Sequence, residues 1–324
     1  MLEDNEYYYI FRALEHGDKK DLESGIKYLR TDSERYVGKP KYDKNSSISL
    51  EEVIDHIKMN YRTDTNCISF TSSPSVGMLF GKTWFSDEYI IYKIPKNNTN
   101  NMYDASKYII DEIEKVVNEY IDNNELTKIQ KYNIDLIDNI VSLEQFNNII
   151  NEQESDESIY NEGIVYDNKI NSYTYYPILS NSENLRKNKL IAKVNTLGIK
   201  LLPILNNQTV ISTLGLAISS KEYINYGSMK LDNFINCPNY IMDMLVVLEQ
   251  SNNPLARTLS LEIINNIDKF KENKFIYEDS KLDSISIDKM YELTNGNIEY
   301  KDGIDIVNSI YLLSKSKLRL LNSL

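Results

Sequence analysis

The sequence predicts an α+β protein, with a strand-rich region followed by a mostly α-helical region. Before residue 180, short apolar segments bounded by turn residues alternate with helical patterns. After residue 180, strand signals fade and helical periodicity dominates. The 324 residues suffice for two domains, and a hydrophobic content of 41% permits packed cores. We therefore expect one domain over residues 1–180 and a second, α-helical domain over residues 181–324.

The first region contains several segments typical of buried or half-buried strands. The expected strands are Tyr7–Leu14, Cys67–Ser72, Tyr89–Pro95, Ser158–Tyr160, Gly163–Ile170 and Tyr173–Leu179. The expected helices are Asp18–Arg30, Ser49–Tyr61, Ser75–Phe80, Ala105–Tyr120 and Asp135–Ile150. Ser49 followed by Glu52 has the spacing of a capping box, which indicates where the second helix begins.

The second region is dominated by apolar residues at helical spacing. The clearest helices are expected at Tyr240–Glu249, Leu255–Phe270 and Asp305–Leu321. This region could recognise a target, regulate access to the first domain or neutralise it.

Composition excludes several classes of protein. A net charge of −12 disfavours non-specific nucleic-acid binding, so a protein partner is expected rather than a nucleic acid. With 2 Cys and 2 His, neither a disulfide framework nor a His-rich metal site is expected. The acidic N-terminus lacks a signal peptide, and the longest apolar stretch is too short to span a membrane. We expect a cytoplasmic protein, or one exported by a route that needs no signal peptide.

The first candidate functional residue is Arg12, in the strand predicted at Tyr7–Leu14. Strand alternation places Arg12 on the same face as Tyr8 and Ile10. An arginine in an apolar strand needs an anionic partner, because an unpaired buried charge is strongly unfavourable. The partner could be an anionic ligand, or a carboxylate in a structural salt bridge. Alternatively, Arg12 could lie at the end of the strand and reach solvent.

The second candidate is a pair of hydroxyls in the strand predicted at Cys67–Ser72. Alternation places Ser69 and Thr71 on one face, and Ile68 and Phe70 on the other. Two hydroxyls on one face can order a polar ligand. The alternative is a half-buried strand that leads into a helix cap.

The third candidate is Glu157, at the end of an acidic loop and just before the strand predicted at Ser158–Tyr160. A solvent-exposed glutamate is the alternative interpretation. Glu152 and Glu154 in the same loop compete with it for any functional role.

Together, these three positions resemble the Arg–Ser–Glu class of ADP-ribosyltransferases, which includes cholera-toxin-like and clostridial enzymes. Residues 8–14, residues 56–57 together with 67–81, and residues 156–170 are similar to that family's three motifs in their order and in their residue types. Phe70 replaces the middle residue of the family's usual Ser-Thr-Ser. The family usually has Glu or Gln two residues before its catalytic Glu. Here that residue is Ser155 for Glu157, and Glu152 for Glu154.

The resemblance implies a split β-sandwich with flanking helices and the cleavage of the nicotinamide–ribose bond of NAD⁺. Glu157 would bind the ribose 2-hydroxyl and stabilise the oxocarbenium-like transition state. Arg12 would clamp the diphosphate, so that Arg12→Ala should weaken NAD⁺ binding. Ser69 would position the glutamate and the ribose, with Phe70 and Thr71 also at the NAD⁺ site. No metal would be needed.

The resemblance implies transfer of ADP-ribose to a macromolecule by a bacterial, toxin-like effector or defence protein, which could have a neutralising partner. Ser155 weakens an arginine-modifying assignment, because a second carboxylate usually activates the guanidinium there. One alternative is an NAD⁺ glycohydrolase with water as acceptor. Another is a non-catalytic interaction protein that does not bind NAD⁺.

Overall fold

The chain forms two compact units, each assembled from separate segments of the sequence. The computed structural model describes residues 2–38, 47–58, 65–84, 88–97, 101–145, 163–167, 172–176, 181–249, 256–265 and 267–268. Unit 1 is formed by residues 1–29, 70–100 and 229–324, and unit 2 by residues 30–69 and 101–228. The units therefore do not follow the expected division at residue 180, because each takes segments from both sides of it.

Unit 1 contains an antiparallel sheet. Its elements are β1 (Leu2–Glu3), β2 (Tyr7–Ala13), α1 (His16–Glu23), β3 (Tyr28–Leu29), α3 (Pro74–Trp84), β5 (Tyr89–Pro95), β10 (Met229–Lys230), η3 (Leu231–Asn233), β11 (Phe234–Cys237), α9 (Asn239–Glu249) and α10 (Ala256–Asn265). Strand β5 lies between β2 and β11, with Ile91 opposite both Phe11 and Ile235. Strand β1 pairs with β2, and the end of β4 (Cys67–Thr71) also pairs with β2, through Thr71 and Phe11.

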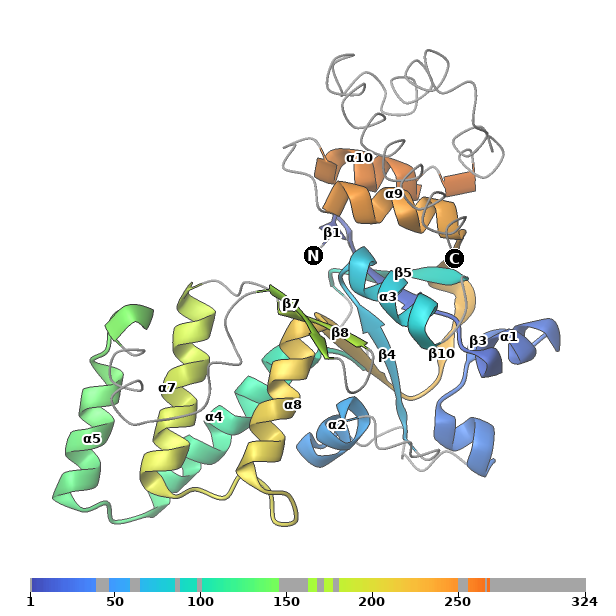
Figure 1. The fold of residues 1–324 in the computed structure, drawn as a ribbon. Coiled ribbons are helices and arrows are strands. Elements are labelled where there is room, and N and C mark those ends of the chain that lie inside the picture. Colours follow the sequence, from blue (N-terminus) through green and yellow to red (C-terminus); the bar gives the residue numbers. More distant parts are fainter. Residues whose placement is uncertain are drawn as a thin grey trace. The chain divides into compact units, whose positions relative to one another are not determined.

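The core of unit 1 lies between this sheet and helices α3, α9 and α10 (Figure 1). Tyr9, Phe11 and Ala13 all belong to this core, as strand alternation predicts. From the helices, Met242 and Ile263 pack into the same cluster and are fully buried. Strand β2 is therefore part of the packed core of unit 1.

Unit 2 combines strands with a group of helices. Its elements are η1 (Ser33–Val37), α2 (Leu50–Ile57), the first residues of β4, β6 (Met102–Asp104), α4 (Ala105–Asn123), α5 (Lys128–Asp138), β7 (Gly163–Asp167), β8 (Ser172–Tyr176), α7 (Asn181–Leu197), α8 (Asn207–Ser219) and β9 (Glu222–Tyr226). Strand β9 lies between β4 and β6. Strands β7 and β8 form a separate antiparallel pair.

Helices α4, α5, α7 and α8 lie side by side in unit 2 (Figure 1). Their apolar faces meet in one core, to which Ile109, Val194 and Leu214 contribute buried side chains. Ile224 of β9 and Ile54 of α2 are buried in the same core. This packing holds α2 and β9, which carry the polar side chains described below.

The structure confirms a mixed α and β composition with antiparallel sheets, and it corrects the expected course of the chain after residue 180. Helices α7, α8, α9 and α10 lie there, but so do strands β9, β10 and β11. Helices predominate among the described residues after 180, as expected, but the strands that lie among them pair with strands from earlier in the chain. The expected segments Ser158–Tyr160 and Asp305–Leu321 lie outside the described residues.

The bounds of the expected helices differ from the observed ones most at α1 and α5. The helix that overlaps the one expected at Asp135–Ile150 is α5, which begins at Lys128, where Thr127 and Gln130 form a capping box, and ends at Asp138. The helix expected at Asp18–Arg30 is α1, which ends at Glu23 and is followed by β3. Gly25, with a φ of 80°, lies directly after that helix, in a conformation that glycine adopts without strain.

Candidate functional site

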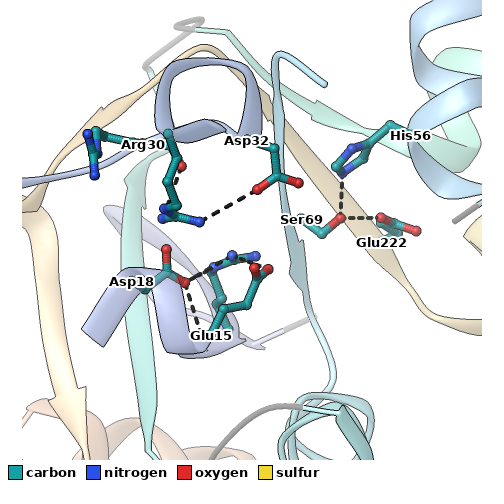
Figure 2. Close-up of polar contacts among 9 residues, drawn as sticks. Glu15, Asp18, Arg30, Asp32, His56, Ser69 and Glu222 are labelled. Atoms are coloured by element: carbon teal, nitrogen blue, oxygen red, sulfur yellow. Dashed lines mark hydrogen bonds and ion pairs between the residues drawn. The ribbon is translucent and has the colours of Figure 1, made fainter. Parts of the chain in front are cut away.

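The hydroxyl of Ser69 is the centre of a polar cluster in unit 2. Ser69 lies on β4, where its neighbours Cys67 and Ile68 are buried and Ser69 itself is partly exposed. Its Oγ lies 2.7 Å from Oε1 of Glu222, to which it donates a hydrogen bond. It also lies 2.7 Å from Nε2 of His56 (Figure 2). The three side chains come from α2, β4 and β9, which are separate in sequence.

Glu222 is placed by a tight connection between α8 and β9. Helix α8 ends at Ser219, and Lys221 has a left-handed φ of 46°, which is uncommon for a residue other than glycine. Glu222 is then the first residue of β9, next to β4. The same turn brings the hydroxyl of Ser220 to 3.3 Å from Oε2 of Glu222, so each carboxyl oxygen contacts one serine.

The protein around Glu222 disfavours the charged form of this carboxyl group. Burial raises its pKa to about 7, while the hydrogen bonds from Ser69 and Ser220 partly oppose that rise. Among the described residues, no lysine, arginine or histidine forms an ion pair with Glu222. Glu222 is thus a partly exposed carboxyl group that titrates near neutral pH, as acids and bases at functional sites often do.

His56 is presented by the amphipathic helix α2. The helix begins with a capping box, in which Ser49 accepts a hydrogen bond from the backbone of Glu52. Val53, Ile54 and Ile57 are buried in the core of unit 2, and His56 is partly exposed. The apolar face of the helix therefore fixes the position from which the imidazole reaches Ser69.

Arg12 belongs to unit 1, whereas Ser69 belongs to unit 2. Its side chain is 9% exposed and forms ion pairs of 2.7 Å with Glu15 and 3.0 Å with Asp18. Burial lowers the pKa of Arg12, but the attraction of Asp18 and Glu15 outweighs burial, and the pKa is raised overall. The structure therefore places Arg12 in a salt bridge of the kind that the sequence left open as an alternative to ligand binding.

Phe70 and Thr71 are both buried in unit 1. The ring of Phe70 packs among aromatic rings, with centroid distances of 6.0 Å to Tyr92 and 6.3 Å to Phe234. The hydroxyl of Thr71 accepts a hydrogen bond of 3.1 Å from the backbone of Ser73, just before α3 begins. The contacts of Phe70 and Thr71 within the protein are therefore sufficient to explain their positions without a bound ligand.

Glu157, Glu152 and Glu154 lie outside the described residues, so the structure does not place them beside Ser69 or elsewhere. Sequence reasoning missed Glu222 and His56. Glu222 follows an apolar helix and precedes Tyr223, Ile224 and Tyr226, a pattern that could have indicated a strand with a glutamate at its start.

Comparisons with known proteins identify no relative. No family model, no curated protein and no solved structure matches the chain. Within the described ranges, no helix is long and apolar enough to cross a membrane. Over the same ranges, no group of three or more His, Cys, Asp and Glu side chains could hold a metal ion.

Proposed function

We propose that this protein is an NAD⁺-dependent mono-ADP-ribosyltransferase, and that Glu222 rather than Glu157 is its catalytic carboxylate. The observation that carries the proposal is the hydrogen bond from Ser69 to Glu222 on neighbouring strands. The resemblance to the Arg–Ser–Glu class implies such a serine–glutamate pair, with the serine positioning the glutamate. Ser69 was expected to have this role, and Glu222 is the carboxyl group that it contacts.

The chemistry requires a carboxylate beside the ribose of NAD⁺. When the nicotinamide–ribose bond breaks, positive charge develops on the ribose in an oxocarbenium-like transition state. Ionised Glu222 would accept a hydrogen bond from the ribose 2-hydroxyl through one oxygen, and its charge would stabilise the transition state. Ser69 would hold the other oxygen in place. Nicotinamide leaves as a neutral molecule, and the acceptor attacks the anomeric carbon and loses a proton.

The residue at position 220 indicates which chemical group of the acceptor would receive ADP-ribose. The family usually has Glu or Gln two residues before the catalytic glutamate, and here that position is Ser220. Its hydroxyl contacts Glu222 itself, and it carries no charge that could activate a guanidinium. We therefore disfavour arginine as the acceptor, and propose a macromolecule that offers a different nucleophile.

The resemblance implies that Arg12 clamps the diphosphate of NAD⁺, and this role stays a prediction. To bind phosphate, its guanidinium would have to exchange at least one of its contacts with Glu15 and Asp18 for phosphate oxygens. A bidentate guanidinium can do so, because phosphate and carboxylate oxygens present similar geometry to it.

The order of the three side chains argues against a serine hydrolase. In a Ser–His–acid triad the imidazole lies between the hydroxyl and the carboxylate, which orients the imidazole as a base. Here the hydroxyl of Ser69 lies between His56 and Glu222. The arrangement orients a carboxylate rather than activating a nucleophile.

The proposal is tested with Glu222→Gln, and with Glu157→Gln and Glu154→Gln as matched variants. We expect Glu222→Gln to lower the rate of nicotinamide release by about 100-fold or more while NAD⁺ binding, measured by calorimetry, is nearly unchanged. The other two variants should retain the parental rate. Loss of activity in Glu157→Gln alone would return the assignment to the acidic loop.

The acceptor is tested by incubating the protein with labelled NAD⁺ and a cell lysate, followed by mass spectrometry. Labelled macromolecules would support transfer, whereas free ADP-ribose alone would indicate an NAD⁺ glycohydrolase. A parent protein that neither binds nor consumes NAD⁺ would contradict both, and would favour a non-catalytic interaction protein.

A further inference from the structure

The imidazole of His56 has no part in the chemistry proposed above, yet it contacts the residue that positions Glu222. Its Nε2 atom lies 2.7 Å from Oγ of Ser69, and the same Oγ lies 2.7 Å from Oε1 of Glu222 (Figure 2). Both distances lie within the range of well-formed hydrogen bonds. The three groups therefore form a chain of two hydrogen bonds, and in each bond one atom must be the donor and the other the acceptor.

Counting protons fixes that direction. The hydroxyl of Ser69 carries a single proton, and an ionised carboxylate can only accept hydrogen bonds. When Glu222 is ionised, the proton of Ser69 must point to Oε1 of Glu222. The contact with His56 can then form only if Nε2 carries a proton and donates it to Oγ of Ser69. The reverse chain requires a protonated Glu222, and a His56 whose Nε2 accepts.

The surroundings of His56 favour the donating form. His56 lies in the last turn of α2, where the negative end of the helix dipole favours a donor or a positive charge. The other titratable groups on the three elements include Glu52 and Asp55 on α2, Cys67 on β4, and Tyr223 on β9. Burial raises the pKa of Cys67, and the charges of Glu52 and Glu222 raise it further, so the thiol stays neutral.

We propose that His56 is a positioning residue, which donates its Nε2 proton to Ser69 and thereby directs the proton of Ser69 onto the carboxylate of Glu222. The imidazole removes the freedom of the hydroxyl to turn away from Glu222. It acts through Ser69, with no contact to the reacting atoms. The kinetic part of this inference rests on the proposed function, but the direction of the hydrogen bonds does not.

The direction is measured by ¹⁵N nuclear magnetic resonance of the histidine side chains. The chain has 2 His, so the spectrum of His16→Gln shows His56 alone. The measurement is made at about pH 9, well above the pKa of Glu222, where the carboxylate is ionised. We expect Nε2 to carry the proton. A neutral ring with its proton on Nδ1 would overturn the proposal, and this result requires no substitution at the site itself.

The positioning role is measured with His56→Gln and His56→Leu. The amide nitrogen of Gln can replace Nε2 as a donor, whereas Leu has a comparable volume and no donor. We expect His56→Leu to lower kcat for nicotinamide release by about 10- to 100-fold, the range expected for one hydrogen bond within a charged network. KM for NAD⁺ should change little, and His56→Gln should restore most of kcat.

The exposed His16→Gln is the matched control and should have the parental kcat. Thermal unfolding of each variant shows whether it is folded. A folded His56→Leu with parental kcat would overturn the positioning role, as would a His56→Gln no better than His56→Leu. If the parent does not consume NAD⁺, the proposed function fails, and the ¹⁵N measurement still decides the hydrogen-bond direction.

Discussion

At the scale of single residues, Glu222 shows how a partly buried carboxyl group links the stability of the fold to pH. Its ordinary pKa is 4.5, and the folded protein raises it to about 7. A group whose pKa is raised on folding binds protons more strongly in the folded state. The stability that it contributes is fully present below pH 4.5 and is lost as the pH rises through about 7.

This linkage predicts how Glu222→Gln changes the pH dependence of unfolding. The parent should lose stability between pH 5 and pH 8 relative to the variant, because only the parent must ionise a partly buried group. The full pKa difference corresponds to about 3 kcal/mol, and partial exposure of Glu222 reduces our expectation to about 1 to 2 kcal/mol. Urea unfolding of the parent and of Glu222→Gln at pH 5 and at pH 8 measures this difference in the free energy of unfolding. Equal pH dependence would show that Glu222 titrates as an exposed glutamate does.

A second prediction at this scale concerns Arg12. Its partner Asp18 has a fully buried side chain, so Arg12→Met would leave a buried carboxylate without this cation. We expect a loss of about 3 to 5 kcal/mol in the free energy of unfolding, part of which Asp18→Asn should restore. Lys19→Met, which removes the exposed ion pair with Glu88, is the control and should cost less than about 1 kcal/mol. Equal effects of the two substitutions would mean that the Arg12 pair contributes no more than a surface pair.

At the scale of elements, the start of α2 is expected to affect the site through the position of His56. The side chain of Ser49 caps the helix that carries His56, and Thr127 caps α5 in the same way. We expect Ser49→Ala and Thr127→Ala each to lower stability by about 1 kcal/mol. Only Ser49→Ala should also lower the rate of nicotinamide release, because only α2 contacts Ser69. Equal rates for the two variants would contradict a role of α2 in the site.

The same scale shows which parts of the fold could be predicted from the sequence. The strand expected at Tyr89–Pro95 has the observed bounds, because its run of apolar and β-branched residues is typical of a buried strand. Strand β9 was missed because Glu222–Tyr226 contains polar residues and lies among strong helical patterns. Such a segment becomes a strand through its neighbours β4 and β6, which sequence periodicity does not reveal.

The candidate site could be predicted only in part, for a related reason. Ser69 was identified because its neighbours are apolar and strand alternation separates it from them. Its partner Glu222 lies 153 residues away, and local patterns carry no information about such a contact. His56 was missed because a lone histidine on an amphipathic helix gives no signal until the packing of that helix is known.

At the scale of the whole molecule, the segments that form unit 1 and the segments that form unit 2 alternate along the chain. A fragment of residues 1–180 would lack α7, α8 and β9 of unit 2, and β11, α9 and α10 of unit 1. We expect this fragment to show no cooperative thermal unfolding by circular dichroism, because both cores would be incomplete. A fragment of residues 1–268 retains every described element and should unfold cooperatively. Cooperative unfolding of 1–180 would restore the separate N-terminal domain expected from the sequence.

The late position of β9 also has a consequence for biosynthesis. A ribosome that has made Ser69 must add 153 further residues before Glu222 exists. At translation rates of about 5 to 20 residues per second, this delay is roughly 8 to 30 s. During that interval a nascent chain carries the hydroxyl of Ser69 without the carboxyl group that it contacts, so the hydrogen bond between Ser69 and Glu222 cannot form until late in synthesis.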